Sequence, residues 1–225
     1  NTITDDTSPN VIDYSAVGVN LNVNLTATNT TVDNTVKPDD FTGTFTNIQT
    51  GSGNDDVFVT RALTGTTLQT NDGNDIFYFQ NDGTNDYIGD GATLLDGGAA
   101  TTVDTADFST IAGALTVNYT GCAANTTVTS GVSSTLTNFE SFIGGTAADT
   151  FNVAWSPCNL TFNGGGTTDT DTIDYSTSAS GTNLTFTLNG TTDVTDVTNH
   201  HNLVSFSILR GTNQADVFTL TNDAG

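Results

Sequence analysis

Apolar and polar residues alternate along much of the chain, with an apolar residue at every second position. The alternation is clear over residues 19–25, 115–119 and 184–188, and around Phe77 and Phe79. A period of two predicts β-strands with one buried face, because successive side chains in a strand point to opposite faces. No stretch combines a helical period with capping residues. The pattern therefore predicts an all-β protein.

Two markers recur three times along the chain. The first is an Asp-aromatic-Ser triplet, and the second is an aromatic or aliphatic strand that leads into a Gly/Asp turn. The triplets end at Ser15, Ser109 and Ser176, and the second marker is measured at the turn aspartates Asp56, Asp149 and Asp216. The triplets are spaced by 94 and 67 residues and the second marker by 93 and 67. Because two independent markers give nearly the same spacing, we infer a three-copy internal repeat.

The repeat copies cover approximately residues 1–60 with an insert over 61–95, then 96–158 and 159–225. Near the insert, aspartates recur at positions 75, 86, 96 and 107, in steps of 11, 10 and 11 residues. Two such steps make a coil of about 21 residues, typical of a two-sided solenoid. We predict a single domain over 1–225, a parallel β-solenoid or β-roll of about ten coils. A tandem β-sandwich is the alternative.

The two end segments, 220–225 and 1–15, are expected to resemble the two halves of one coil. This pattern fits a block from a larger tandem array or a subunit that docks end to end.

The chain is strongly acidic, with a formal net charge of -22 from 25 acidic and three basic residues. Nucleic acid and anionic membrane surfaces both require clustered Lys and Arg, so neither is an expected partner. No apolar run approaches the roughly 20 residues that span a bilayer, so no membrane insertion is expected. Glu140 is the only glutamate. A set of acids that is almost all aspartate favours turns and cation coordination.

A turn motif repeats along the chain, in which an aspartate closes a Gly/Asn-rich turn and an apolar residue follows two positions later. It reads Gly-Ser-Gly-Asn-Asp-Asp-Val-Phe at 51–58, Asn-Asp-Gly-Asn-Asp-Ile-Phe at 71–77, Gly-Gly-Thr-Ala-Ala-Asp-Thr-Phe at 144–151 and Gly-Thr-Asn-Gln-Ala-Asp-Val-Phe at 211–218. Glycine allows a tight turn and aspartate supplies a hard anionic oxygen, which together suit Ca²⁺. The alternative interpretation is that these residues are simply good turn formers.

These motifs resemble the bacterial RTX (haemolysin-type) calcium-binding repeats, whose nonapeptide pattern is Gly-Gly-x-Gly-x-Asp-x-U-x, where U is a large apolar residue. Residues 144–152 fit with Ala147 in place of one glycine, and 50–58 fit with Thr50 in the first position. The chain lacks a clean run of consecutive nonapeptides. We therefore expect few full sites, about two to five, clustered near 51–107.

The resemblance implies that turn aspartates and glycine carbonyls bind Ca²⁺ between successive turns of a β-roll. By position, this role falls to Asp55, Asp75 and Asp149, with carbonyl groups of Gly53 and Gly73. The full set of candidate metal ligands is Gly53, Asp55, Asp56, Asp72, Gly73, Asp75, Asp86, Asp96, Asp104, Asp149 and Asp171.

Cys122 and Cys158 are the only cysteines, and both lie in loop-like segments. We expect a structural disulfide between them, in keeping with an extracellular setting. Two unpaired thiols or a bond to a neighbouring subunit are the alternatives. His200 and His201 are not expected to form a metal pair, because adjacent residues in a strand point to opposite faces. A solvated loop position is expected for them.

No arrangement of catalytic residues has a supporting local motif, so the chain is not expected to be an enzyme. We expect a secreted, Ca²⁺-stabilised structural protein that assembles end to end into an extracellular filament or surface layer. Its partners would be copies of itself or cell-surface components. The alternative is a Ca²⁺-dependent repeat module of a larger secreted adhesin, toxin or enzyme.

Overall fold

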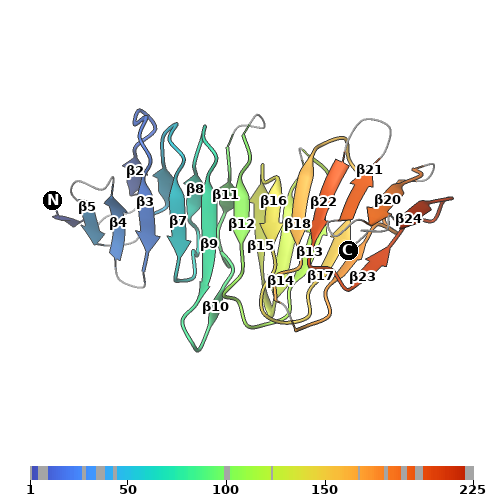
Figure 1. Cartoon of the computed structure of the whole chain (residues 1–225). Coiled ribbons are helices and arrows are strands. Elements are labelled where there is room, and N and C mark those ends of the chain that lie inside the picture. Colours follow the sequence, from blue (N-terminus) through green and yellow to red (C-terminus); the bar gives the residue numbers. More distant parts are fainter. Residues whose placement is uncertain are drawn as a thin grey trace, which may run out of the picture.

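The computed structural model describes residues 2–4, 10–26, 29–33, 39–42, 45–98, 102–122, 124–166, 168–179, 182–188, 192–195 and 200–220. Over these residues the chain forms strands and turns and no helix. The strands make two long sheets that lie one behind the other along the molecule (Figure 1). The prediction of an all-β solenoid is confirmed.

The larger sheet has 14 strands. In spatial order they are β1 (Thr2–Thr4), β5 (Asp39–Thr42), β4 (Asn29–Asp33), β3 (Asn22–Leu25), β7 (Asp56–Val59), β9 (Ile76–Asn81), β12 (Thr105–Asp107), β16 (Ser141–Ile143), β18 (Leu160–Asn163), β22 (His200–Val204), β21 (Thr192–Thr195), β20 (Thr185–Leu188) and β24 (Val217–Leu220), with β10 (Asp86–Tyr87) paired to β9.

The smaller sheet has ten strands. In spatial order they are β2 (Val11–Asp13), β6 (Asn47–Gln49), β8 (Thr67–Gln69), β11 (Leu94–Asp96), β15 (Val132–Thr137), β14 (Thr126–Ser130), β13 (Thr116–Tyr119), β17 (Thr150–Val153), β19 (Thr172–Asp174) and β23 (Ile208–Arg210).

Successive coils pair in parallel, so that equivalent residues stack along the molecule. In the larger sheet Phe77 pairs with Val57 on one side and with Ala106 on the other. Ala106 pairs in turn with Phe142, which pairs with Phe162. In-register pairing keeps these apolar residues on the same, core-facing side of the sheet, as a half-buried strand requires.

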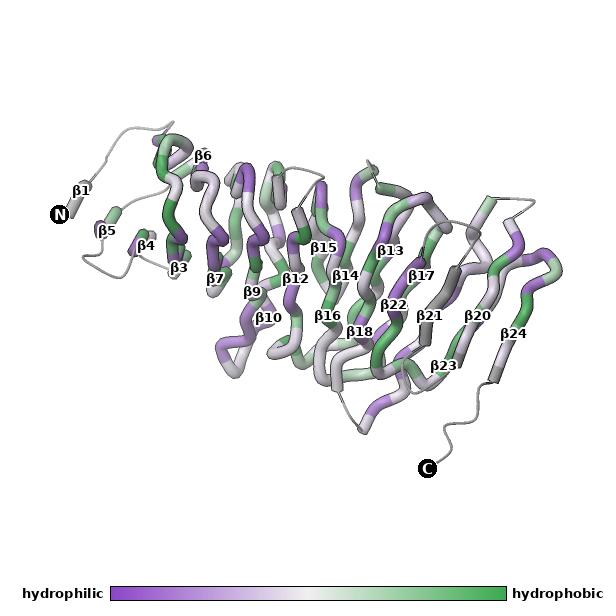
Figure 2. Tube along the Cα trace, turned by 45° about the horizontal axis from the view of Figure 1, so that its top comes forward, coloured by the Kyte–Doolittle hydropathy of each residue, from purple (hydrophilic) through white to green (hydrophobic). Residues whose placement is uncertain are grey.

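The core lies between the two sheets, and alternate residues of each strand point into it. Figure 2 shows the resulting mixture of hydrophilic and hydrophobic positions along each strand. Stacked aromatic rings extend through the core: Phe79 lies on Phe108 with 4.4 Å between ring centroids, and Phe142 on Phe162 with 5.6 Å. Burial of each such side chain stabilises the fold by about 1.5–3 kcal/mol.

The Asp-aromatic-Ser triplets form the same turn in all three places. The backbone N–H of Ser15 donates to the Asp13 carboxylate at 2.9 Å, and the equivalent bonds of Ser109 and Ser176 are both 2.8 Å. This Asp turn is a common local role of aspartate. The sequence marker therefore corresponds to one recurring local structure. The copy boundaries inferred from the sequence stay a prediction.

The structure departs from an uninterrupted parallel stack after each of these turns. There the chain makes three antiparallel strands before parallel stacking resumes: β3–β4–β5, β13–β14–β15 and β20–β21–β22. A further antiparallel hairpin, β9–β10, lies in the expected insert. Parallel and antiparallel strands of a half-buried sheet share the same alternation, so the pattern alone did not distinguish them.

The expected match between the two chain ends falls largely on residues 1, 5–9 and 221–225, which lie outside the described residues.

Candidate metal centre

The turn aspartates lie immediately before strands and point into the core. Asp55 precedes β7, Asp75 precedes β9 and Asp104 precedes β12, and all three side chains are fully buried. Their position follows from the motif itself. An aspartate two residues before an inward-facing apolar residue shares the inward face, because the side-chain period of a strand is two.

Each of these carboxyl groups accepts a hydrogen bond from the coil before it. Asp55 Oδ1 accepts the backbone N–H of Leu21 at 2.8 Å, and Asp75 Oδ1 accepts that of Asp55 at 2.6 Å. Asp104 Oδ1 accepts the N–H of Asp75 at 2.8 Å, and Glu140 Oε2 accepts the N–H of Asp104 at 3.0 Å. The four acids form a continuous row along the larger sheet, which we call the acid row.

The same bond recurs in the next repeat copies. In the smaller sheet Asp149 Oδ1 accepts the N–H of Leu115 at 2.7 Å, and Asp171 Oδ1 accepts the N–H of Asp149 at 2.8 Å. Near the end of the larger sheet, Asp216 Oδ1 accepts the N–H of Leu184 at 2.9 Å. The turn aspartates therefore link one coil to the next, one backbone N–H at a time.

The second carboxyl oxygens differ in their surroundings. Asp149 Oδ2 accepts the N–H of Gly145 at 2.6 Å, and Asp104 Oδ2 accepts the Thr102 hydroxyl at 3.3 Å. Asp55 Oδ2 and Asp75 Oδ2 are buried and have no hydrogen-bond partner within the described part of the chain. Within the described residues these are the two buried oxygens of the acid row that lack a donor. The Thr50 and Thr70 side chains lie near enough to Asp55 and Asp75, respectively, to lower the pKa of each in part.

Burial raises the pKa of every acid in the row, because a charged carboxylate is poorly solvated in the core. It raises the pKa of Asp75 to about 7 and that of Asp104 to about 8, with repulsion from neighbouring acids adding to the effect. Burial also raises the pKa of Asp55 and of Glu140. In the other sheet it raises the pKa of Asp149 to about 6.

The predicted glycine ligands lie where successive coils approach most closely. A side chain on Gly73 would overlap the Gly53 carbonyl oxygen, and one on Gly53 would overlap the backbone of Val19. Gly73 also has a φ of +131°, which other residues rarely adopt. Close backbone approach is therefore enough to require glycine at both positions.

The remaining candidates of the larger sheet lie away from the acid row. Asp56 faces outward on β7 beside Tyr78, and Asp72 is exposed in a turn. Asp86 accepts three hydrogen bonds, from the Asn81 side chain at 2.6 Å and from the N–H groups of residues 112 and 113 at 3.0 and 2.8 Å. These contacts fasten the β9–β10 hairpin to the loop beside it.

Asp96 belongs to a ladder of polar side chains on the smaller sheet. It accepts bonds from the Asn138 side chain at 2.8 Å, from the N–H of Gly98 at 3.1 Å and from the Gln69 side chain at 3.4 Å. Gln69 in turn accepts a bond from Gln49 at 3.0 Å. Asp96 is therefore already occupied by neighbouring donors.

These contacts test whether the residues fit a row of calcium ions, each of which takes six to eight oxygen ligands. Most carboxyl oxygens of the candidate set already accept hydrogen bonds. Within the described ranges, no group of three or more His, Cys, Asp or Glu residues comes together to hold a metal. The donor set does not fit one ion per turn. Calcium binding stays a prediction, and the candidate side-chain ligands are reduced to Asp55 and Asp75.

Two acids that accept a backbone N–H of the preceding coil are absent from the set of candidate metal ligands. Glu140 ends the acid row, and Asp216 repeats the bond near the end of the chain. Both carry the same signal as the residues that were found, an acid two residues before an apolar one, Phe142 and Phe218 respectively. Spacing from the apolar residue is thus a better guide than the glycines of the turn.

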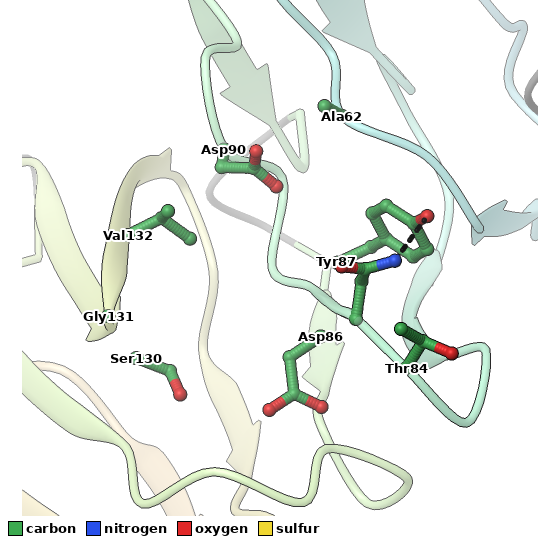
Figure 3. Close-up of a pocket in the computed structure, with 9 residues that line it drawn as sticks. Ala62, Thr84, Asp86, Tyr87, Asp90, Ser130, Gly131 and Val132 are labelled. Atoms are coloured by element: carbon green, nitrogen blue, oxygen red, sulfur yellow. Dashed lines mark hydrogen bonds between the residues drawn. The ribbon is translucent and has the colours of Figure 1, made fainter.

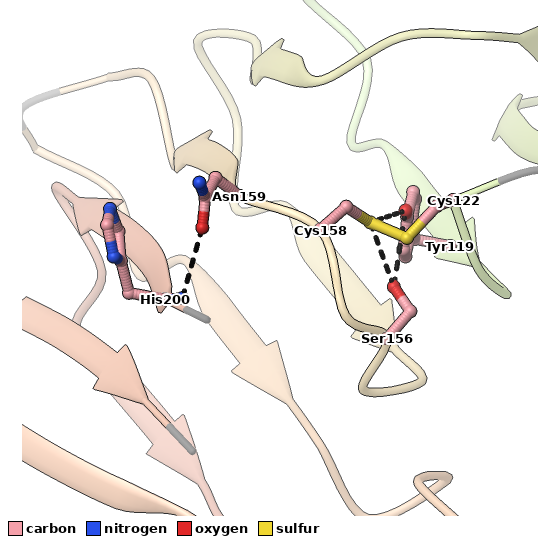
Figure 4. Close-up of a disulfide and its surroundings, with 6 residues drawn as sticks. All are labelled: Tyr119, Cys122, Ser156, Cys158, Asn159 and His200. Carbon is pink, nitrogen blue, oxygen red and sulfur yellow. Dashed lines mark hydrogen bonds between the residues drawn. A yellow bond between two sulfur atoms is a disulfide. The ribbon is translucent and has the colours of Figure 1, made fainter. Parts of the chain in front are cut away.

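Cys122 and Cys158 are bonded to each other, with Cα atoms 6.0 Å apart (Figure 4). The bond joins the turn after β13 to the turn after β17, two neighbouring strands of the smaller sheet. The Tyr119 hydroxyl lies 3.0 Å from the Cys158 sulfur. The disulfide therefore links two successive coils of the smaller sheet.

The two histidines lie on opposite faces of β22. His201 is fully buried, 2.9 Å from the Tyr175 hydroxyl, and its ring lies 4.2 Å from that of Trp155. His200 is exposed. The expectation of a solvated loop is wrong, because both residues belong to β22 and alternation along the strand turns His201 into the core.

No helix in the described residues is long and apolar enough to cross a bilayer. Neither a family model nor a curated protein matches this chain. The resemblance to RTX repeats accordingly stays a prediction.

Proposed function

We propose that this chain is a structural protein, a rigid β-solenoid that lengthens outside the cell by stacking end to end on copies of itself. The observation that carries the proposal is the apolar end of the stack. Val217 and Phe218 on β24 are 54% and 51% exposed, and Ile208 on β23 is 38% exposed. Phe218 stacks one ring face on Phe186 at 4.4 Å, as core rings do on their neighbours.

Both strands at this end pair on one side only within the described residues. Unpaired strand edges with apolar side chains readily add a further strand. The opposite end is built alike, since β1 and β2 also pair on one side, and Val11 on β2 is 58% exposed. A second copy placed end to end would continue both sheets. Such a head-to-tail contact does not close on itself and yields a filament.

The net charge of -22 opposes this contact, because two acidic copies repel each other. Salt or a divalent cation would reduce the repulsion. Calcium is the cation we propose, with Asp55 and Asp75 as the residues that have a buried oxygen to offer. Bound there, it would neutralise carboxylate charge within the stack. The disulfide supports an extracellular setting.

The proposal is tested by light scattering of the purified chain after size exclusion, over a range of protein concentration and with either calcium or EGTA. Wild-type protein should form species larger than a monomer, and Phe218→Asp should remain monomeric. Val103→Asp is the matched control, since Val103 is 55% exposed but lies within the stack, and it should assemble as wild type does.

Equal assembly by the Phe218→Asp variant would contradict the end-to-end contact. A wild-type chain that stays monomeric under every condition would favour the alternative, a repeat module of a larger secreted protein. Assembly that survives EGTA unchanged would remove calcium from the proposal and leave the filament.

A further inference from the structure

A cleft of about 500 Å³ opens between the β9–β10 hairpin and the tip of the β14–β15 hairpin (Figure 3). Asp86, Tyr87 and Asp90 line one side, and Ser130 and Val132 line the other. We call it the hairpin cleft. Both hairpins depart from the parallel coils, so the cleft is formed by the parts of the chain that the regular stack does not use.

Hydrogen bonds fix the β9–β10 side of the cleft. Asp82 accepts the Tyr87 hydroxyl at 2.9 Å, and it also accepts two backbone N–H groups of its own turn, both at 2.8 Å. Asp86 accepts the N–H groups of Ala112 and Gly113 at 3.0 and 2.8 Å. A wall held in this way presents its groups without a further loss of conformational entropy on binding.

The fixed wall is negatively charged. Backbone N–H groups of its turn lower the pKa of Asp82. Partial burial opposes ionisation of Asp86, but hydrogen bonds from Asn81 and from the neighbouring loop outweigh it and lower the pKa of Asp86. No Lys or Arg is among the described residues that line the cleft.

Asp90 carries an unsatisfied acceptor at this cleft. Its Oδ1 atom is buried and has no hydrogen-bond partner among the described residues. Figure 3 shows the Asp90 carboxylate directed toward Tyr87. The residue as a whole is partly exposed. A buried carboxylate oxygen without a donor is costly, so a cationic donor that paired with this carboxylate from the cleft would be bound favourably.

The cleft also offers apolar surface. Val132 is 45% exposed, and Ala62 and the ring of Tyr87 lie along the same opening. Lys and Arg side chains combine an alkyl stem with a cationic head, and an Arg head also packs on aromatic rings. Their chemistry matches an opening with an apolar wall and an unsatisfied carboxylate.

We propose that the hairpin cleft binds a basic segment of a partner protein, with one Lys or Arg side chain packed on Val132 and Tyr87 and its head paired with Asp90. A metal ion fits less well, because the Asp86 oxygens already accept hydrogen bonds. A neutral sugar would gain nothing from the charge. This role is separate from end-to-end assembly, which involves other strands.

The test uses the full chain and an end-blocked penta-arginine peptide, with binding followed by fluorescence anisotropy at about 0.15 M salt to screen non-specific attraction. Asp90→Asn should weaken binding about three- to five-fold, the range of a single partly exposed ion pair. Val132→Ser should weaken it as well. Asp72→Asn removes the same charge from an exposed turn outside the cleft and should leave the affinity unchanged.

Equal weakening by Asp90→Asn and Asp72→Asn would overturn the proposal, because binding would then depend on net charge alone. Binding of an end-blocked Gly-Ser pentapeptide as tight as that of penta-arginine would overturn it too. Circular dichroism checks that each variant folds, and Val132→Ser carries the test if Asp90→Asn does not.

Discussion

The buried aspartate of each turn performs a task that its chemistry makes difficult. A carboxyl group in the core loses the water that would solvate its charge. In return, its oxygen accepts a backbone N–H of the preceding coil, which at a coil edge would otherwise have no strand partner. The short side chain of aspartate fixes the distance between the two coils. An acid in this position therefore has two opposite effects. Its hydrogen bond maintains the distance between the two coils, and the ionisation of its buried carboxyl group destabilises the fold.

Substitution of Asp75 separates these two effects. Asp75→Asn keeps the acceptor oxygen and removes the buried charge, so its free energy of unfolding at about pH 8 should equal or exceed that of wild type. Asp75→Ala leaves the Asp55 N–H without an acceptor and should lose about 1–3 kcal/mol. Urea unfolding in EGTA measures the free energy of unfolding of both variants. Asp72→Asn, at an exposed position, serves as the control.

A lower stability of Asp75→Asn than of Asp75→Ala would show that charge, and not the acceptor oxygen, is what this position contributes.

The raised pKa values of the buried aspartates predict how the free energy of unfolding depends on pH. The pKa is about 7 for Asp75, about 8 for Asp104 and about 6 for Asp149 in the folded chain, against 3.8 for an ordinary aspartate. The folded state thus binds these protons more tightly than the unfolded state. The free energy of unfolding should fall as pH rises from about 4 to about 8.

Urea midpoints in EGTA across this range measure the slope. The slope should be smaller in the Asp75→Asn/Asp104→Asn double variant, because two of the titrating groups are then absent. A midpoint that rises with pH throughout the range would contradict the assignment.

At the level of single residues, the sequence identified most of the acid row but not the task of its members. Asp55, Asp75 and Asp104 were expected as turn residues and candidate metal ligands, and their burial follows from period-two spacing, since each stands two residues before an inward-facing apolar residue. Their hydrogen-bond partners were not predictable, because each carboxyl oxygen accepts a backbone N–H of the preceding coil, 20 to 34 residues away in sequence. Local spacing carries no information about such partners.

Among the elements, the strand pattern was predictable and the strand direction was not. The alternation over 115–119 correctly indicates β13, whose Val117 and Tyr119 are buried. The two strands that follow it run antiparallel, and their reversal depends on a tight turn at Gly131, where φ is +70°. One glycine in a chain with 23 is too weak a signal to mark a reversal.

The disulfide connects elements, because it links the turns that follow two neighbouring strands. Its two cysteines are 36 residues apart in sequence. Replacing Cys122 and Cys158 together by alanine should lower the free energy of unfolding by about 2–4 kcal/mol, since the unfolded chain loses a constraint. Thermal unfolding of the variant and of reduced wild type measures the loss. An unchanged midpoint in both would contradict a stabilising role.

At the scale of the whole molecule, stacking gives a rod whose stability adds up coil by coil and whose ends resemble its interior. Phe218 illustrates the consequence, because its ring has the stacking geometry of a core residue and yet is half exposed. The high negative charge limits lateral association between rods more than it limits contact at the small ends. Lengthwise growth is the mode of assembly that this shape and charge favour.

Electron cryo-microscopy of the assembled wild-type protein tests the lengthwise stack most directly. We predict unbranched filaments in which both sheets continue across each junction, with strands about 4.8 Å apart along the filament axis. Particles one chain long, or rods joined side by side with their ends free, would contradict this account.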